Sequence, residues 1–341
     1  MFGKKSARLK PILIALSPVV CFLFSMSIGH YEISAYEVLD MLFSKLTASE
    51  MRYGDMMQTV VFEVRLPRVI LAMMVGCSLS VSGAVYQCVF KNPMASPNIL
   101  GTSSGAGLGT ALAIIFSFGA VYTQMISFAF GLLAVAITYA ISTKIGRRGN
   151  LILVFVLTGI LVSTVFQALI SLVKYTADPY EKLPAITFWL MGSLSTASKN
   201  DILIILIPFL LGIVPLFLMR WRLNILSLGD DDIKCLGIDV RNLRLIVIGC
   251  STLLTASCVS VAGIIGWVGL IMPHLVRFIA GPNNRIVVPL SVILGGAFLM
   301  LVDTACRTVT PSEIPLGILT SVIGAPLFFI ILLRSQRGAR S

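Results

Sequence analysis

Three arginines stand at the ends of long apolar runs and are the first candidates for a function in this chain. Arg65 and Arg68 flank a proline just before one run, and Arg307 follows another. Because arginine forms bidentate hydrogen bonds with carboxylates, the three could form a basic patch that accepts acidic side chains of an external partner. The alternative is that their charged groups only anchor the helices by reaching from the membrane to its aqueous interface.

An acidic segment between two other apolar runs is the second candidate. Its three consecutive aspartates suit the start of a helix, where the helix dipole favours negative charge, and Gly237 suits a helix end. Two short helices hinged at Gly237 would form a rigid projection, whereas a solvated connector fits the same residues. Consecutive aspartates point apart on a helix, so we do not expect a metal site here. The segment contains Leu228, Gly229, Asp230, Asp231, Asp232, Leu236, Gly237, Ile238 and Asp239.

Glycine and proline predict where helices pack closely or begin. Gly101, Gly105 and Gly109 are four residues apart, so we expect them to share a helix face that another helix can approach closely. The prolines at positions 93 and 97 predict a tight turn, after which Pro97 can open the next helix.

A broken helix is expected between residues 263 and 277. Glycines at 263, 266 and 269, followed by Pro273, are incompatible with an uninterrupted helix. At membrane depth, such a break must be surrounded by protein or line a cavity. His274 is an ionisable group inside this apolar region, which raises a functional hypothesis. No carboxylate lies near it in the sequence, so a structural hydrogen-bond donor is the simpler interpretation.

The C-terminal part of the chain carries the remaining signals. Asp303 and Arg307 are four residues apart, so they can pair on one helix face. Pro315 suits the opening turn of the last helix, and Pro326 predicts a kink in it. The complete set of helix-packing and broken-helix residues is Gly83, Asn92, Pro93, Pro97, Gly101, Gly105, Gly266, Gly269, Pro273, His274, Arg277, Glu313, Pro315, Gly317, Gly324 and Pro326.

The elements that must position these residues are membrane-spanning helices. The 341 residues are 57% hydrophobic and 12% charged, with a mean hydropathy of +0.96. Soluble domains average about 25% charged residues, so the composition excludes a soluble enzyme, a disordered chain and a fibrous repeat. We expect an all-α integral membrane protein with about ten spans. These are 11–29, 68–90, 97–118, 124–143, 151–173, 201–219, 245–264, 266–280, 286–305 and 314–333.

The charge pattern orients these spans. Most of the basic residues fall on the side of the N-terminus, and they are not interleaved with aromatics, so the net charge of +11 indicates lipid rather than nucleic acid as the partner. Both termini are expected in the cytoplasm, with the first apolar run kept as a helix. The single domain 1–341 then divides into a cytoplasmic N-terminus (1–10), an outer loop with a short helix (30–58), an outer interfacial segment (176–199), a cytoplasmic loop (220–244) and a cytoplasmic tail (334–341). The seven cysteines form no CxxC pair and are expected to be small buried hydrophobes.

The order of the motifs resembles a known family. RLPR, SGAVYQ, KNPMASPNILGTSSGAGLG, FWLMGSL, LGDDDIKCLGI, GIIGWVGLIMPHLVR, VDTACR, EIPLG and IGAP occur in this order over about residues 60–333. Together they resemble the FecCD-type permeases of ABC importers for iron–siderophores, haem and vitamin B12. The resemblance implies a ten-helix subunit that pairs, usually with an identical copy, around a central pathway. It also implies two cytoplasmic ATP-binding subunits and an extracytoplasmic substrate-binding protein.

The resemblance assigns roles to two groups of residues. In relatives, the RLPR arginines and the arginine after the ninth span receive glutamates of the binding protein, and Arg65, Arg68 and Arg307 match them. The loop that contacts the ATPase corresponds to Leu228–Asp239. The expected protein is therefore a transport subunit of a bacterial or archaeal cytoplasmic membrane and not an enzyme, with ATP hydrolysis on a separate subunit and no cofactor of its own.

The substrate and the mechanism remain open to alternatives at this point. The first expectation for the substrate is an iron chelate, followed by haem, cobalamin and oxyanions. A transporter driven by an ion gradient would need carboxylates or histidine pairs in mid-membrane, and the spans contain almost none away from their ends. A membrane scaffold without a ligand is the other alternative, against which the broken helix and the outer arginines argue.

Overall fold

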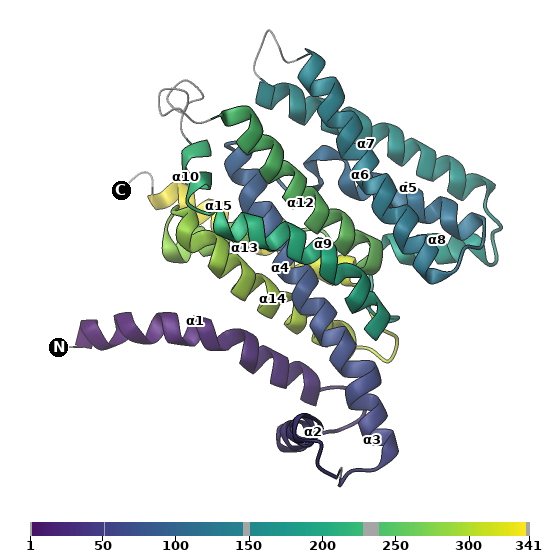
Figure 1. The fold of residues 1–341 in the computed structure, drawn as a ribbon, viewed down its shortest axis with the longest axis vertical. Coiled ribbons are helices and arrows are strands. Elements are labelled where there is room, and N and C mark those ends of the chain that lie inside the picture. The colour runs from purple at the N-terminus through teal and green to yellow at the C-terminus, as the bar shows by residue number, and fades with distance from the viewer. Residues whose placement is uncertain (1, 51, 146–150, 228–238, 339–341) are drawn as a thin grey trace.

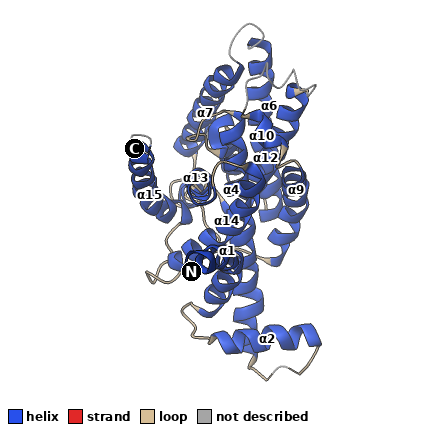
Figure 2. Ribbon diagram, turned by 90° about the vertical axis from the view of Figure 1, so that its left-hand side faces the viewer, coloured by secondary structure: helices blue, strands red, loops and turns tan. Residues whose placement is uncertain are grey.

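The structure is a computed structural model that describes residues 2–50, 52–145, 151–227 and 239–338. These residues form helices joined by short connections, and no strand occurs among them (Figure 2). Figure 1 shows α4 in the middle of the molecule, α5 to α8 to its right and upper right, and α1 to α3 in the lower part. The expectation of an all-α protein is confirmed for the part of the chain described.

The first half of the chain contains α1 (Phe2–Ser27), α2 (Ala35–Thr47), α3 (Asp55–Thr59), the π-helical η1 (Val60–Arg65), α4 (Leu66–Val89), the 3₁₀ turn η2 (Pro97–Leu100), α5 (Thr102–Ile115), α6 (Ala120–Ile145) and α7 (Leu151–Thr176). The second half contains α8 (Lys182–Leu190), α9 (Lys199–Leu218), α10 (Arg222–Leu226), α12 (Val240–Ala262), α13 (Val268–Ala280), α14 (Asn284–Cys306) and α15 (Leu316–Gly338).

Helices occur where apolar runs predicted spans. Among the described residues, six apolar helical stretches are long enough to cross a membrane, namely Asp55–Val89, Ala120–Ile145, Ile152–Thr176, Lys199–Leu218, Val240–Ala262 and Asn284–Cys306. Shorter apolar helices occupy the other expected ranges, namely Leu13–Ser27, Thr102–Ile115, Val268–Ala280 and Leu316–Ile331. The chain is therefore a multi-pass membrane protein. Short helices also form inside the two expected connecting segments: α2 lies within 30–58, and α8 lies within 176–199.

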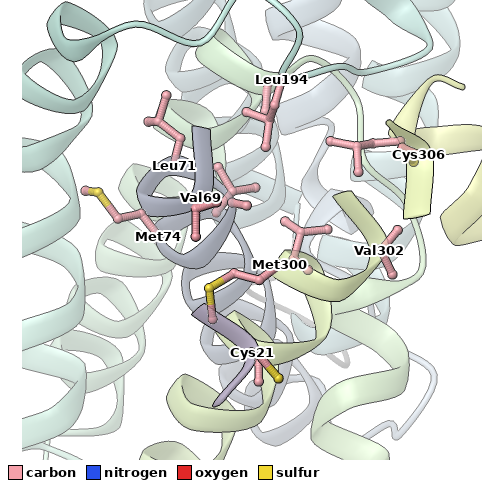
Figure 3. Close-up of a cluster of buried hydrophobic side chains, with 14 of the residues drawn as sticks. Cys21, Val69, Leu71, Met74, Leu194, Met300, Val302 and Cys306 are labelled. Atoms are coloured by element: carbon pink, nitrogen blue, oxygen red, sulfur yellow. The ribbon is translucent and has the colours of Figure 1, made fainter. Parts of the chain in front are cut away.

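The core forms around α4, and its neighbours cover it almost completely. In its most apolar window, 89% of the residues of the α3–α4 stretch are buried, against 22% for α9 and 28% for α7. Figure 3 shows part of this core, where Val69 of α4 lies on the side of the helix that faces Met300 of α14 and Cys21 of α1. The exposed apolar faces of α7 and α9 fit a lipid environment, because hydrocarbon carries no penalty for apolar surface.

Glycines permit the closest helix contacts, as the sequence predicts at most positions. A Cβ on Gly83 would lie 1.7 Å from the carbonyl oxygen of Gly269, so α4 and α13 touch backbone to backbone. Gly105 and Gly109 face α6 in the same way and confirm that prediction. The prediction for Gly101 is wrong: this residue precedes α5, has a φ of +87° and faces α7 rather than α6. Its left-handed backbone turns the chain from η2 into α5.

The broken helix is confirmed, but the break differs in detail from the expectation. α12 ends at Ala262 and α13 begins at Val268, so the chain is non-helical from residue 263 to 267. Pro273 lies inside a continuous α13, and Pro326 lies inside a continuous α15. Neither proline ends its helix. The break is instead placed by Gly263, whose φ of +68° stops α12, and by Trp267, which also has a positive φ.

Backbone hydrogen bonds connect the end of α12 to the segment after α8, and the end of α8 to the start of α15. The amide of Ser193, after α8, donates to the carbonyl of Ala262 over 2.9 Å. The amide of Gly317, in the first turn of α15, donates to the carbonyl of Met191 over 3.0 Å. A Cβ on Gly317 would lie 2.3 Å from that carbonyl oxygen, so no larger residue fits. The ends of α8 and α12 and the start of α15 therefore form one packed junction.

Candidate functional site: an arginine cluster at the ends of α4 and α14

The three arginines singled out in the sequence lie close together at one end of α4. The π-helical turn η1 leads into α4 and carries Arg65, while Arg68 occupies the first turn of α4. Arg307 follows the last turn of α14, one turn after Asp303. α4 and α14 pack along their lengths, so residues separated by more than 200 positions meet here. The sequence could not show this convergence.

Arg68 is held by two carboxylates. Its Nε donates to both carboxylate oxygens of Asp303 over 3.0 Å, and its Nη2 donates to Oδ1 over 2.9 Å. Its Nη1 donates to Oε1 of Glu313, in the loop before α15, over 2.7 Å. This two-sided arrangement uses the planar fork of donors that distinguishes arginine from lysine.

Arg65 and Arg307 cap the end of α1. Nη1 of Arg65 donates to the carbonyls of Met26 and Ser27 over 2.6 and 2.9 Å, and its Nη2 donates to the carbonyl of Tyr31. Nη2 of Arg307 donates to the carbonyl of Ser25. The last carbonyls of a helix lack intrahelical partners and carry partial negative charge. The two arginines therefore satisfy these carbonyls and join α1 to α4 and α14.

The cluster is buried and carries more positive than negative charge. Arg65, Arg68 and Arg307 are only 3–6% exposed and Asp303 is 1% exposed, whereas the Glu313 side chain is 36% exposed. Burial lowers the pKa of Arg307 to about 10, with Asp303 acting in the opposite direction. Nε of Arg307 lies 3.9 Å from Asp303 and is buried without a hydrogen bond. The expected Asp303–Arg307 pair is therefore present as a long contact, and the strong partner of Asp303 is Arg68.

These positions bear on both interpretations of the arginines. The side chains are enclosed by protein atoms, so they are not extended along the surface as interfacial anchors would be. Their donors point to oxygens of this chain, and the contacts of Arg68 with Glu313 and of Arg65 with Ser27 and Tyr31 are only partly buried. Docking of an external carboxylate therefore stays a prediction. The sequence analysis did not predict that Glu313 pairs with Arg68. The available signal was that Glu313 is an isolated acidic residue just before the last apolar run.

The other candidate residues lie elsewhere in the molecule. In the acidic segment, Leu228–Ile238 lies outside the described residues, while Asp239 caps α12 by accepting from the amides of Arg241 and Asn242 over 3.0 and 3.1 Å. His274 packs edge-on against Phe328 of α15, with 6.0 Å between ring centroids.

The residues around the Asn92 turn and in α13 have structural contacts. Oδ1 of Asn92 accepts from the amide of Met94 over 2.9 Å, as expected of a tight turn before Pro97. Arg277 joins α13 to α4 by donating to the Ala84 carbonyl over 3.1 Å and to the Gln87 side chain. The six cysteines that the structure describes are buried and unpaired, in agreement with their expected role as small apolar residues.

Fold and cluster together define a polytopic helical membrane protein whose helices α1, α4 and α14 are joined by a buried network of hydrogen bonds and ion pairs. Comparison with known proteins places it more narrowly. The model of the FecCD transport family matches residues 16–334. The chain therefore belongs to the FecCD transport family, as the order of its motifs predicts.

Individual relatives are similar over most of their length. The molybdate import system permease protein MolB of Haemophilus influenzae is 41% identical over 95% of both chains. A probable iron chelatin transport system permease protein of Helicobacter pylori is 43% identical over 81% of this chain and 83% of its own. A solved structure described as an inward-facing conformation of a putative metal-chelate type ABC transporter has a TM-score of 0.85 and 38% identity, covering 94% of this chain and 97% of the other.

Proposed function

We propose that this chain is the permease subunit of a binding-protein-dependent ABC importer in the cytoplasmic membrane of a bacterium or archaeon. The observation that carries the proposal is the agreement in fold with the metal-chelate type ABC transporter over 94% of the chain. Membership of the FecCD transport family supports it independently. The permease provides the pathway, and ATP hydrolysis takes place on a separate subunit.

The proposed assembly has three kinds of partner. Two cytoplasmic ATP-binding subunits dock on the side of the acidic segment. Residues 228–239 transmit their motion to α12, whose N-cap is Asp239. A second, identical permease chain completes the pathway, since closed symmetric assemblies are the usual form of homo-oligomers. An extracytoplasmic binding protein delivers the substrate to the end of α4 where the arginine cluster lies. Each ligand must favour one conformation over the other to drive alternating access.

The proposed docking contact is an exchange of carboxylates on Arg68. Glu313 is the one partly exposed carboxylate of the cluster, so an incoming glutamate of the binding protein can compete with it for Nη1 of Arg68. Asp303 would stay in place because it is enclosed and held by three hydrogen bonds. Release of Glu313 would free the loop that leads into α15 at Leu316. Docking would thereby be coupled to the start of a spanning helix.

The proposed substrate is a metal-containing ligand, with an iron chelate first and a cobalamin-like complex as a related option. The iron chelatin permease and the metal-chelate type transporter support this assignment. Molybdate is the second candidate, because the MolB permease is similar over 95% of both chains.

Gentle purification of the tagged chain from its native membrane, with mass spectrometry of the associated proteins, tests the proposed assembly. We expect an ATP-binding subunit to be recovered together with this chain, and a tethered binding protein where one is present. A homo-oligomer without any ATPase, even after crosslinking, would contradict the proposal and favour a transporter driven by an ion gradient.

A further inference from the structure

The helix α2 extends from the edge of the molecule and presents an uncovered apolar face. In Figure 1 it is seen end-on beside the last turn of α1, and in the perpendicular view of Figure 2 it lies across the lower edge, away from the bundle. α2 therefore runs across the direction of α1, as a helix lying in the membrane plane would. The Ser34–Glu37 capping box fixes its first turn.

The side chains of α2 divide into three faces. With 3.6 residues per turn, Val38 and Met41 share the face towards the protein, and both are fully buried. A second face carries four large apolar residues that are 48–86% exposed, namely Tyr36, Leu39, Phe43 and Leu46. A third face carries the polar residues Glu37, Asp40 and Ser44.

We propose that the face formed by Tyr36, Leu39, Phe43 and Leu46 is embedded in the lipid at the membrane–water interface, so that α2 is an in-plane anchor of the permease. A helix with an apolar face opposite a polar face lies at this depth, and aromatic residues favour it. Left in water, the four side chains would carry the full hydration cost of their apolar surface.

The neighbouring surface of α1 identifies lipid as the occupant. The exposed side of this apolar helix is formed by large side chains, including Leu13, Leu16, Val20 and Phe24. Because α1 lies in the membrane, this side is in contact with acyl chains. Ile28 and Tyr31 continue the exposed apolar surface from the end of α1 towards α2. The α2 face therefore extends an existing lipid-facing surface into the interface.

The charged residues of α2 are placed to allow this depth. Glu37 is occupied by the capping box, and Oδ2 of Asp40 accepts from the hydroxyl of Tyr53 over 2.9 Å. Nζ of Lys45 lies 5.5 Å from the ring centroid of Phe62, on the protein side of the helix. The apolar face thus carries no charge that would have to enter the lipid.

Tryptophan fluorescence of the full chain in lipid nanodiscs tests this inference. Phe43→Trp places the probe on the apolar face, and Ser44→Trp places it on the polar face one residue away. Each spectrum is compared with that of the parent chain, which has three tryptophans of its own. We expect the added emission of the Phe43→Trp variant to be blue-shifted and largely lost in lipids brominated near the headgroup end of the acyl chain, while that of the Ser44→Trp variant is largely retained.

Three results would overturn the inference. Equal, weak quenching of both variants would place α2 in water. Blue-shifted but unquenched emission of the Phe43→Trp variant would mean that protein, such as a second copy of the chain, covers the face. Equal, strong quenching of both variants would mean that the whole helix is immersed. Leu39→Trp repeats the test on the same face if either first variant fails to fold. The inference depends only on the chain being a membrane protein, so its failure leaves the proposed transport function untouched.

Discussion

Arg68 and Asp303 are joined by three hydrogen bonds of 2.9–3.0 Å, although 235 positions separate them in the sequence. This contact fixes the first turn of α4 against the last turn of α14. Through Arg65 and Arg307 the same cluster holds the end of α1. The residues expected to meet a partner protein are thus also the residues that join three helices.

Removing the central carboxylate should destabilise the fold strongly. Asp303→Asn leaves three buried arginines opposite Glu313 alone, and breaking a buried ion pair costs about 3–5 kcal/mol. Glu63→Gln is the matched control, because it removes the exposed Lys199–Glu63 pair, for which about 0–1 kcal/mol is expected. Equilibrium unfolding in mixed detergent micelles measures both. Equal stability of the two variants would show that the cluster contributes little.

Removing the exposed carboxylate should instead improve docking. Glu313→Gln weakens the competitor for Nη1 of Arg68, so the purified binding protein should associate more tightly, as measured by biolayer interferometry on nanodiscs. Glu32→Gln changes the net charge equally but does not contact Arg68, and it should leave the affinity close to that of the parent. If both variants shift the affinity equally, the affinity depends only on the overall charge. That result would contradict the proposed exchange of carboxylates on Arg68.

The contact between α4 and α13 should not tolerate a methyl group. In Gly83→Ala the new Cβ would meet the carbonyl of Gly269, so the two helices must separate, which costs about 1–3 kcal/mol in an overpacked core. Gly249→Ala is the control in α12, since no atom lies within 4 Å of its added Cβ. We expect the thermal transition in detergent to fall for Gly83→Ala only. An equal fall in the control would point to a general effect of replacing glycine.

The first turn of α2 should depend on pH through Glu37. Hydrogen bonds from the backbone and side chain of Ser34 lower the pKa of this carboxylate below its usual 4.5. A carboxylate with a lowered pKa stabilises the fold above its unfolded-state pKa, and this contribution is lost as pH falls through the folded value. Hydrogen exchange of the α2 amides should therefore become less protected in acid relative to the Glu37→Gln variant. The same pH response in both would exclude Glu37 as its cause.

Patterns that are local in the sequence predicted most of the fold. Apolar runs located the helices, the glycines before Trp267 located the break, and Gly105 and Gly109 located a close packing face. The prediction for Gly101 was wrong because its spacing matches that face, whereas the residue lies before the helix. It follows the η2 turn and has a left-handed backbone conformation. Spacing alone does not report backbone conformation.

Contacts between segments that are distant in the chain could not be predicted from the sequence. The arginines were recognised as unusual, but their burial and their carboxylate partners follow from how α4 packs on α14. Nothing in the order of residues pairs Arg68 with Glu313. The Ser34–Glu37 capping box, in contrast, has the S-x-x-E spacing that marks a helix start, and that signal was available.

Uptake by the reconstituted complex tests the central claim most directly. The chain is placed in liposomes with its co-purified ATPase and binding protein, and accumulation of a radiolabelled iron chelate is followed beside labelled molybdate. The account predicts that one of the two accumulates only with ATP on the ATPase side and only when the permease is present. Uptake that follows an imposed ion gradient and ignores ATP would contradict it.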